Sequence, residues 1–74
     1  NTDVRIIFDN EKERNITITL TDILGKKISD IYTNTLIEGV HSFDVNLSNF
    51  DKGLYFLNIS NNNQNIITKK LIVK

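Results

Sequence analysis

Alternating apolar and polar side chains predict a central β-strand over residues 53–60. Tyr55, Leu57 and Ile59 occupy every second position there, so a strand would place all three on one face. The other face is apolar for only the first half of the segment. Because one face is apolar throughout and the other is apolar in part, we expect this strand to lie inside a sheet, with a neighbour on each side.

The same alternation marks five further strands. It is cleanest over residues 15–22, where isoleucine and leucine alternate with threonine and predict one buried face and one face in water. It is ambiguous over residues 27–33, where Ile28 and Tyr32 share a face and Ile31 takes the other, so we expect a bulge or an edge position there. The five predicted strands cover residues 4–8, 15–22, 27–33, 40–47 and 65–74.

The connections between these strands have polar or glycine-containing sequences. Residues 9–14 contain no apolar side chain and predict a solvated loop. Residues 23–26 predict a tight turn in which Gly25 adopts a positive φ. We expect residues 34–39 to cross between sheets, with Leu36 or Ile37 closing the core. Residues 48–53 predict a short helical turn over Phe50. Residues 61–64 predict a further turn.

Six or seven short strands, a turn about every ten residues and no helical periodicity predict an all-β fold, a small antiparallel Ig-like β-sandwich. A chain of 74 residues fits a single domain with a shallow core. It contains no proline, so charge must protect the edge strands from pairing with other chains. Lys69, Lys70 and Lys74 of the last predicted strand suit that role.

Composition and charge exclude several function classes. Nine basic residues balance nine acidic ones, so no overall field attracts nucleic acid or an anionic membrane. No apolar run approaches the roughly 18 residues of a membrane-spanning helix, and the polar start at residues 1–3 is no signal peptide. The absence of cysteine fits either a reducing compartment or a secreted domain that folds without crosslinks.

The polar residues predict no catalytic site, no metal and no cofactor. His41 is the only histidine, and because adjacent strand residues point to opposite faces, Ser42 and Asp44 cannot form a nucleophilic relay with it. The alternate oxygen ligands Asp44, Asn46 and Ser48 lack the glycine and the distal glutamate of a calcium loop. The aromatic residues fall on the apolar phases of their strands or in a core-plugging turn, and no tryptophan is present to stack on a sugar.

Four segments, in their order and spacing, resemble a known family. They are Asp-Ile-Leu-Gly-Lys at residues 22–26, Gly-Val-His at residues 39–41, residues 47–56, and the lysine-flanked apolar segment at residues 68–74. Together they resemble the type A C-terminal sorting domain of proteins exported by the type IX (Por) secretion system of Bacteroidetes. The resemblance covers nearly the whole chain. It implies a structural role for Asp22, Gly25, Gly39, Gly53 and Tyr55.

Members of this family usually begin with a Pro-Asn-Pro turn, which this sequence lacks. We therefore expect residues 1–74 to be a single C-terminal sorting domain that starts just after this turn and its linker. The resemblance implies that the domain is no enzyme but an export signal for a cargo domain N-terminal to it. The outer-membrane translocon and shuttle components would recognise the folded domain in the periplasm. A cell-surface sortase would then remove it, which leaves the cargo at the cell surface or outside the cell.

The last predicted strand is the expected recognition surface, because its lysines can face a partner while alternate apolar residues hold it on the core. The predicted recognition residues are Lys69, Lys70, Leu71, Ile72, Val73 and Lys74. A carbohydrate-binding or adhesive β-sandwich module of a secreted protein is the alternative function. An unpaired strand edge would also permit an edge-paired or strand-swapped homodimer of the isolated domain.

Overall fold

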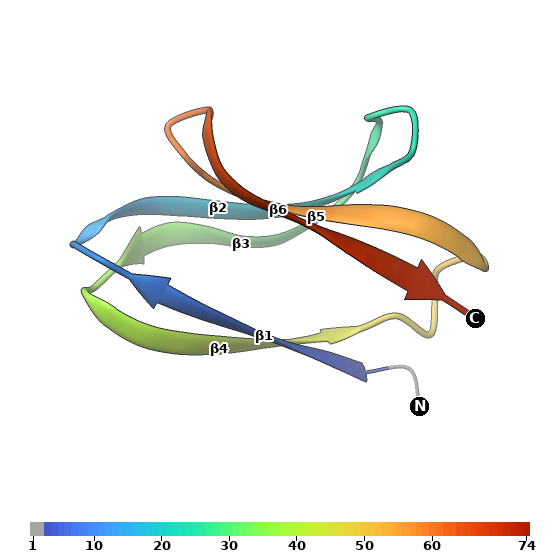
Figure 1. Cartoon of the computed structure of the whole chain (residues 1–74), viewed down its shortest axis with the longest axis horizontal. Coiled ribbons are helices and arrows are strands. Elements are labelled where there is room, and N and C mark those ends of the chain that lie inside the picture. Colours follow the sequence, from blue (N-terminus) through green and yellow to red (C-terminus); the bar gives the residue numbers. More distant parts are fainter. Residues whose placement is uncertain (1–2) are drawn as a thin grey trace.

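The computed structural model describes residues 3–74 and has the predicted all-β fold. Six antiparallel strands form two sheets, one in the order β1-β4 and the other in the order β3-β2-β5-β6, and the sheets face each other as a β-sandwich (Figure 1). The strands are β1 (Asp3–Asn10), β2 (Arg14–Asp22), β3 (Lys27–Leu36), β4 (Gly39–Asn46), β5 (Gly53–Asn61) and β6 (Gln64–Val73). Among the described residues, no helix has the length and apolar character needed to cross a membrane.

The core lies between the sheets and is built from the apolar phase of each strand. β5 pairs with β2 on one side and with β6 on the other, which confirms the predicted central strand. Leu57 of β5 is only 1% exposed, and its cross-strand partner Leu20 of β2 is fully buried. The threonines that alternate with the buried residues of β2 are half-buried. The buried apolar residues are Ile6, Phe8, Ile16, Ile18, Leu20, Leu36, Val45, Leu47, Tyr55, Leu57 and Ile59.

The prediction that residues 9–14 form a solvated loop is wrong at Asn10. β1 continues to Asn10, and β2 begins at Arg14. The Asn10 side chain is fully buried, and its Nδ2 donates to the carbonyl oxygens of Leu36 (2.9 Å) and Ile37 (3.1 Å). Its Oδ1 accepts a hydrogen bond from Arg14 Nε at 2.9 Å. Because a buried amide is tolerated only when it is hydrogen-bonded, these bonds fix the β1–β2 connection against the crossover from β3 to β4.

The β2–β3 hairpin turns at residues 23–26, as predicted, and β3 is an edge strand. Its pairing with β2 shifts register twice, so both the expected bulge and the expected edge position are present. β3 continues past residue 33 to Leu36, so only residues 37 and 38 connect it to β4 in the other sheet. Leu36 is buried whereas Ile37 is 63% exposed, so Leu36 is the residue that closes this end of the core.

The β4–β5 connection is a single turn, not the short helical turn that we predicted. The amide of Phe50 donates to the carbonyl oxygen of Leu47 at 3.1 Å, and no helix forms. Phe50 is half-buried, and its ring centroid lies 6.1 Å from that of Tyr55. The Tyr55 hydroxyl donates to the carbonyl oxygen of Asp51 at 2.7 Å. This bond resembles the tyrosine corner of immunoglobulin-type sandwiches, in which a strand tyrosine bonds back to the preceding loop.

The β5–β6 hairpin has a two-residue turn within the predicted residues 61–64. Asn61 pairs with Gln64, and Asn62 and Asn63 have φ angles of 49° and 68°. Asparagine tolerates this left-handed conformation, and a two-residue type I′ turn requires it at both positions. β6 runs one residue earlier at each end than the predicted segment 65–74.

Candidate recognition surface

β6, the strand predicted to be recognised, is an edge strand that pairs only with β5. Leu71 and Val73 are half-buried and pack against the core, whereas Ile72 between them is 61% exposed. Lys74 follows the last residue of the strand and is exposed. Alternate residues therefore hold the end of β6 in place while the others face solvent, and the chain terminus lies at this end of the sandwich (Figure 1).

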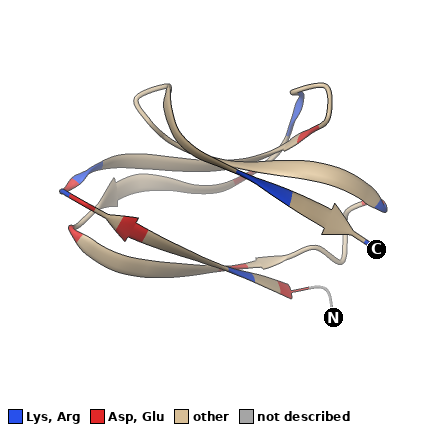
Figure 2. Ribbon diagram, viewed as in Figure 1, with Lys and Arg blue, Asp and Glu red and all other residues tan. Residues whose placement is uncertain are grey.

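The lysines of β6 are exposed on two different sides of the strand. Lys70 lies opposite Phe56 and shares the outward phase of Ile72. Lys69 shares the inward phase of Leu71 but stays exposed, because it borders a groove between β6 and β1. Figure 2 shows these basic residues in the middle of β6, before its arrowhead, with no acidic residue on the strand. β6 is therefore an edge strand with exposed lysines, and the half-buried side chains of Leu71 and Val73 hold it on the core.

Two residues of β5 extend this surface, although the sequence analysis did not assign them to it. Ile72 lies opposite Leu54, and Lys70 lies opposite Phe56. Leu54 is 37% exposed and Phe56 is half-buried, so the outward surface is apolar as well as cationic. The two-residue asparagine turn did not reveal these pairs, because the register shifts by one residue between Ile59 and Ser60, between the turn and this surface.

Asp22 is the last residue of β2, and Gly25 lies in the turn that follows it. Asp22 Oδ1 accepts hydrogen bonds from the amides of Leu24 and Lys26, each at 2.9 Å, and the Asp22 carbonyl oxygen accepts from the Gly25 amide at 3.0 Å. Gly25 has a φ of 86°, as expected. The turn is thus fixed by its own hydrogen bonds, and Leu24 at its tip is 88% exposed.

Gly39 and Gly53 open β4 and β5, with φ angles of 126° and 150°. A Cβ atom added to Gly53 would meet no other atom within 4 Å. The backbone conformation alone therefore disfavours a side chain at this position. Tyr55 follows two positions later and is 8% exposed. Its ring and hydroxyl hold the β4–β5 connection against the start of β5, through the contacts with Phe50 and Asp51.

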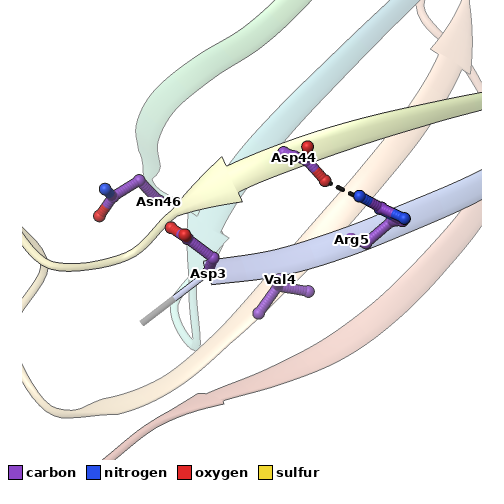
Figure 3. A pocket seen from close by; sticks show the side chains of 5 residues that line it. All are labelled: Asp3, Val4, Arg5, Asp44 and Asn46. Atoms are coloured by element: carbon purple, nitrogen blue, oxygen red, sulfur yellow. Dashed lines mark hydrogen bonds and ion pairs between the residues drawn. The ribbon is translucent and has the colours of Figure 1, made fainter. Parts of the chain in front are cut away.

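The residues considered for catalysis do not converge. His41 Nε2 lies 2.8 Å from the carbonyl oxygen of Ile37, so the ring has a backbone partner. Ser42 and Asp44 are exposed on the other face of β4. Asp44 Oδ1 accepts a hydrogen bond from Arg5 Nε at 3.1 Å in an ion pair across β1 and β4 (Figure 3). Histidine, serine and aspartate therefore cannot act together here.

The ion pair lies in an open hollow of about 400 Å³ at the start of β1 and the end of β4. Its lining residues are Asp3, Val4, Arg5, Asp44 and Asn46 (Figure 3). Asn46 Oδ1 accepts from the Ser48 amide at 2.8 Å, so this oxygen serves the local turn. Over residues 3–74, no group of three or more histidine, cysteine, aspartate or glutamate side chains could hold a metal ion. The lining contains no aromatic ring, so the hollow offers no platform for stacking on a sugar.

These features define a small antiparallel β-sandwich domain with an exposed, lysine-bearing edge strand. The whole chain, residues 1–74, matches the family model described as the secretion system C-terminal sorting domain, and the protein belongs to this family. No curated protein and no solved structure matched the chain. The domain is therefore a non-catalytic secretion signal of the type IX (Por) system, which directs the export of cargo across the outer membrane.

Proposed function

We propose that the outer-membrane translocon and the shuttle components of the type IX system bind this domain through the outward face of β6. Lys70, Ile72 and Lys74 make the contacts, while Leu71 and Val73 hold the strand on the core. The alternation along β6 supports this proposal, because Ile72 is 61% exposed between two residues that pack against the core. A partner can bind that face without unfolding the sandwich.

The route of the cargo belongs to the same proposal. The cargo domain lies N-terminal to this single sorting domain and is joined to it by a linker. The folded domain is recognised in the periplasm. After export, a cell-surface sortase removes it, and the cargo stays at the cell surface or outside the cell.

Charge reversal on the outward face of β6 tests the proposal. A reporter protein is fused to residues 1–74 and expressed in hosts with and without the type IX system, and extracellular reporter is measured. Lys70→Glu with Lys74→Glu should abolish export and leave the free energy of unfolding within about 0.5 kcal/mol of the parent, as surface substitutions usually do.

The matched control is Lys12→Glu with Lys26→Glu, which makes the same change in net charge at two exposed lysines outside β6. This control should be exported like the parent. If the folded Lys70→Glu and Lys74→Glu variant is exported as efficiently as the control, the outward lysines do not carry the signal.

A further inference from the structure

The two-stranded sheet has regular edges, whereas the edges of the four-stranded sheet are irregular. Every residue of β1 pairs with β4 in an unbroken register. In contrast, the register shifts between β2 and β3 and again between β5 and β6. β3 and β6 carry lysines, but β1 and β4 contain neither lysine nor proline. Bulges, lysines and prolines are among the features that keep an edge strand from pairing. β1 lacks all three and carries Asp3, Arg5 and Asp9 as its charged residues, so its regular edge can accept another strand.

Only one of these two edges is accessible. On the side where β4 meets β3, the rings of Tyr32 and Phe43 have centroids 5.0 Å apart, and His41 reaches the carbonyl oxygen of Ile37. On the opposite side, a groove of about 130 Å³ separates β1 from β6. The sandwich is thus closed beside β4 and open beside β1.

The lining of the groove indicates which side chains would fit it. Its apolar surface includes Ile6 of β1, Leu57 of β5 and Leu71 of β6. Lys69 and Lys70 border it, and no acidic residue lines it. Within residues 3–74, neither lysine forms an ion pair. The groove therefore joins an unpaired backbone edge to apolar surface and to two free ammonium groups.

We infer that the free edge of β1 binds an extended peptide, which adds to the sheet as a further strand and carries both apolar and acidic side chains on the face that meets the groove. The backbone hydrogen bonds of such strand addition give affinity, and the side chains at alternate positions give specificity. On that face, the apolar side chains of the peptide contact Ile6 and Leu71, and its carboxylates pair with Lys69 and Lys70. This inference deepens the proposed function, because the groove shares Lys70 and Leu71 with the predicted recognition surface.

The direct test is a titration of the purified domain with a valine–glutamate peptide of eight residues, the length of β1. Its odd positions, which share one face of a strand, are valine and glutamate in turn, and its even positions are threonine. Two peptides of the same length are controls. One has lysine in place of each glutamate, and the other is the valine–glutamate peptide with all of its backbone nitrogens methylated. The first peptide should bind and slow amide exchange in β1. Both controls should bind at least about tenfold more weakly, because one reverses the charge and the other cannot donate backbone hydrogen bonds.

A charge-reversed domain then tests the lysines. Lys69→Glu with Lys70→Glu should weaken binding of the valine–glutamate peptide about tenfold, because two exposed ion pairs are lost and become repulsive. Lys12→Glu with Lys26→Glu, with the same net charge, should stay within about twofold of the parent. Thermal melting of both variants verifies that they fold.

The inference is overturned if the valine–glutamate peptide fails to bind, if the methylated peptide binds equally well, or if both lysine pairs have the same effect. The assay contains no secretion machinery, so its outcome is independent of export. Peptide binding that depends on Lys69 and Lys70, together with normal export of the Lys70→Glu and Lys74→Glu variant, would support the groove and refute the proposed recognition face.

Discussion

Leu57→Ala should remove a large share of the stability of this domain. Leu57 is 1% exposed, lies on the central strand and pairs with the fully buried Leu20. The substitution removes three carbons, which corresponds to about 2.4 kcal/mol at about 0.8 kcal/mol per buried methylene. A residual cavity of roughly 60 Å³ would add about 1.4 kcal/mol. Because Leu57 also borders the β1–β6 groove, Ile6 and Leu71 can partly collapse onto the site, so we expect a total of about 2–4 kcal/mol.

Thermal and urea unfolding followed by circular dichroism measure this loss. A domain of 74 residues has a free energy of unfolding of about 4–11 kcal/mol, and a loss of about 3 kcal/mol lowers Tm by roughly 12–24 °C. Ile72→Ala on the neighbouring strand is the control, because Ile72 is 61% exposed and its truncation should cost no more than about 0.5 kcal/mol. A Leu57→Ala variant that melts within about 4 °C of the parent would refute the central position of β5 in the core.

Three further substitutions test the turns and the buried polar group, each by chemical denaturation. Gly53→Ala should lower the free energy of unfolding by about 1–3 kcal/mol, because a backbone φ of 150° is strained for any residue with a side chain, even where space is open. An unchanged denaturation midpoint would contradict this. Asn10→Ala should cost about 1–3 kcal/mol by leaving the Leu36 carbonyl oxygen without its side-chain donor, and a neutral result would mean that water replaces the amide. Tyr55→Phe should cost about 0.5–1.5 kcal/mol through loss of the bond to Asp51, whereas a gain in stability would show that this bond is not favourable.

The strands could be predicted from the sequence because their burial follows the period of two. Ile16, Ile18 and Leu20 are fully buried and the threonines between them are not, so a local pattern was sufficient to place β2. The same holds for β5. The prediction ended β3 at residue 33 and missed its end because residues 34 and 35 are polar and exposed. They belong to the strand only through their pairing with β2, which a local pattern does not contain.

Asn10 shows why a buried polar group escapes sequence analysis. It stands in a charged run, and such runs usually indicate solvated surface. Its burial depends on the carbonyl oxygen of Leu36, which is 26 positions away in the sequence. The packing that brings these two segments together follows from the arrangement of the whole sandwich. The polarity of Asn10 was visible in the sequence, but its partners were not.

The burial pattern of the candidate recognition surface was predictable within β6 but not across strands. The alternation near the end of the chain correctly placed Leu71 and Val73 inward and Ile72 outward. The contribution of Leu54 depends on the sheet order β3-β2-β5-β6 and on the β5–β6 register. The groove beside β1 depends on two strands that are far apart in the sequence and in different sheets.

The lysines of β6 have two physical roles that a substitution must separate. A charged side chain discourages an edge strand from pairing with other chains, so Lys70→Ala could reduce export merely through aggregation. Glutamate also keeps an edge charged and unattractive for pairing, but it reverses the sign that an acidic partner would recognise. Lys74→Glu alters the outward face without touching the groove, and Lys69→Glu alters the groove without changing the outward face. Export and peptide binding measured on these two single variants therefore assign each function to its own side of the strand.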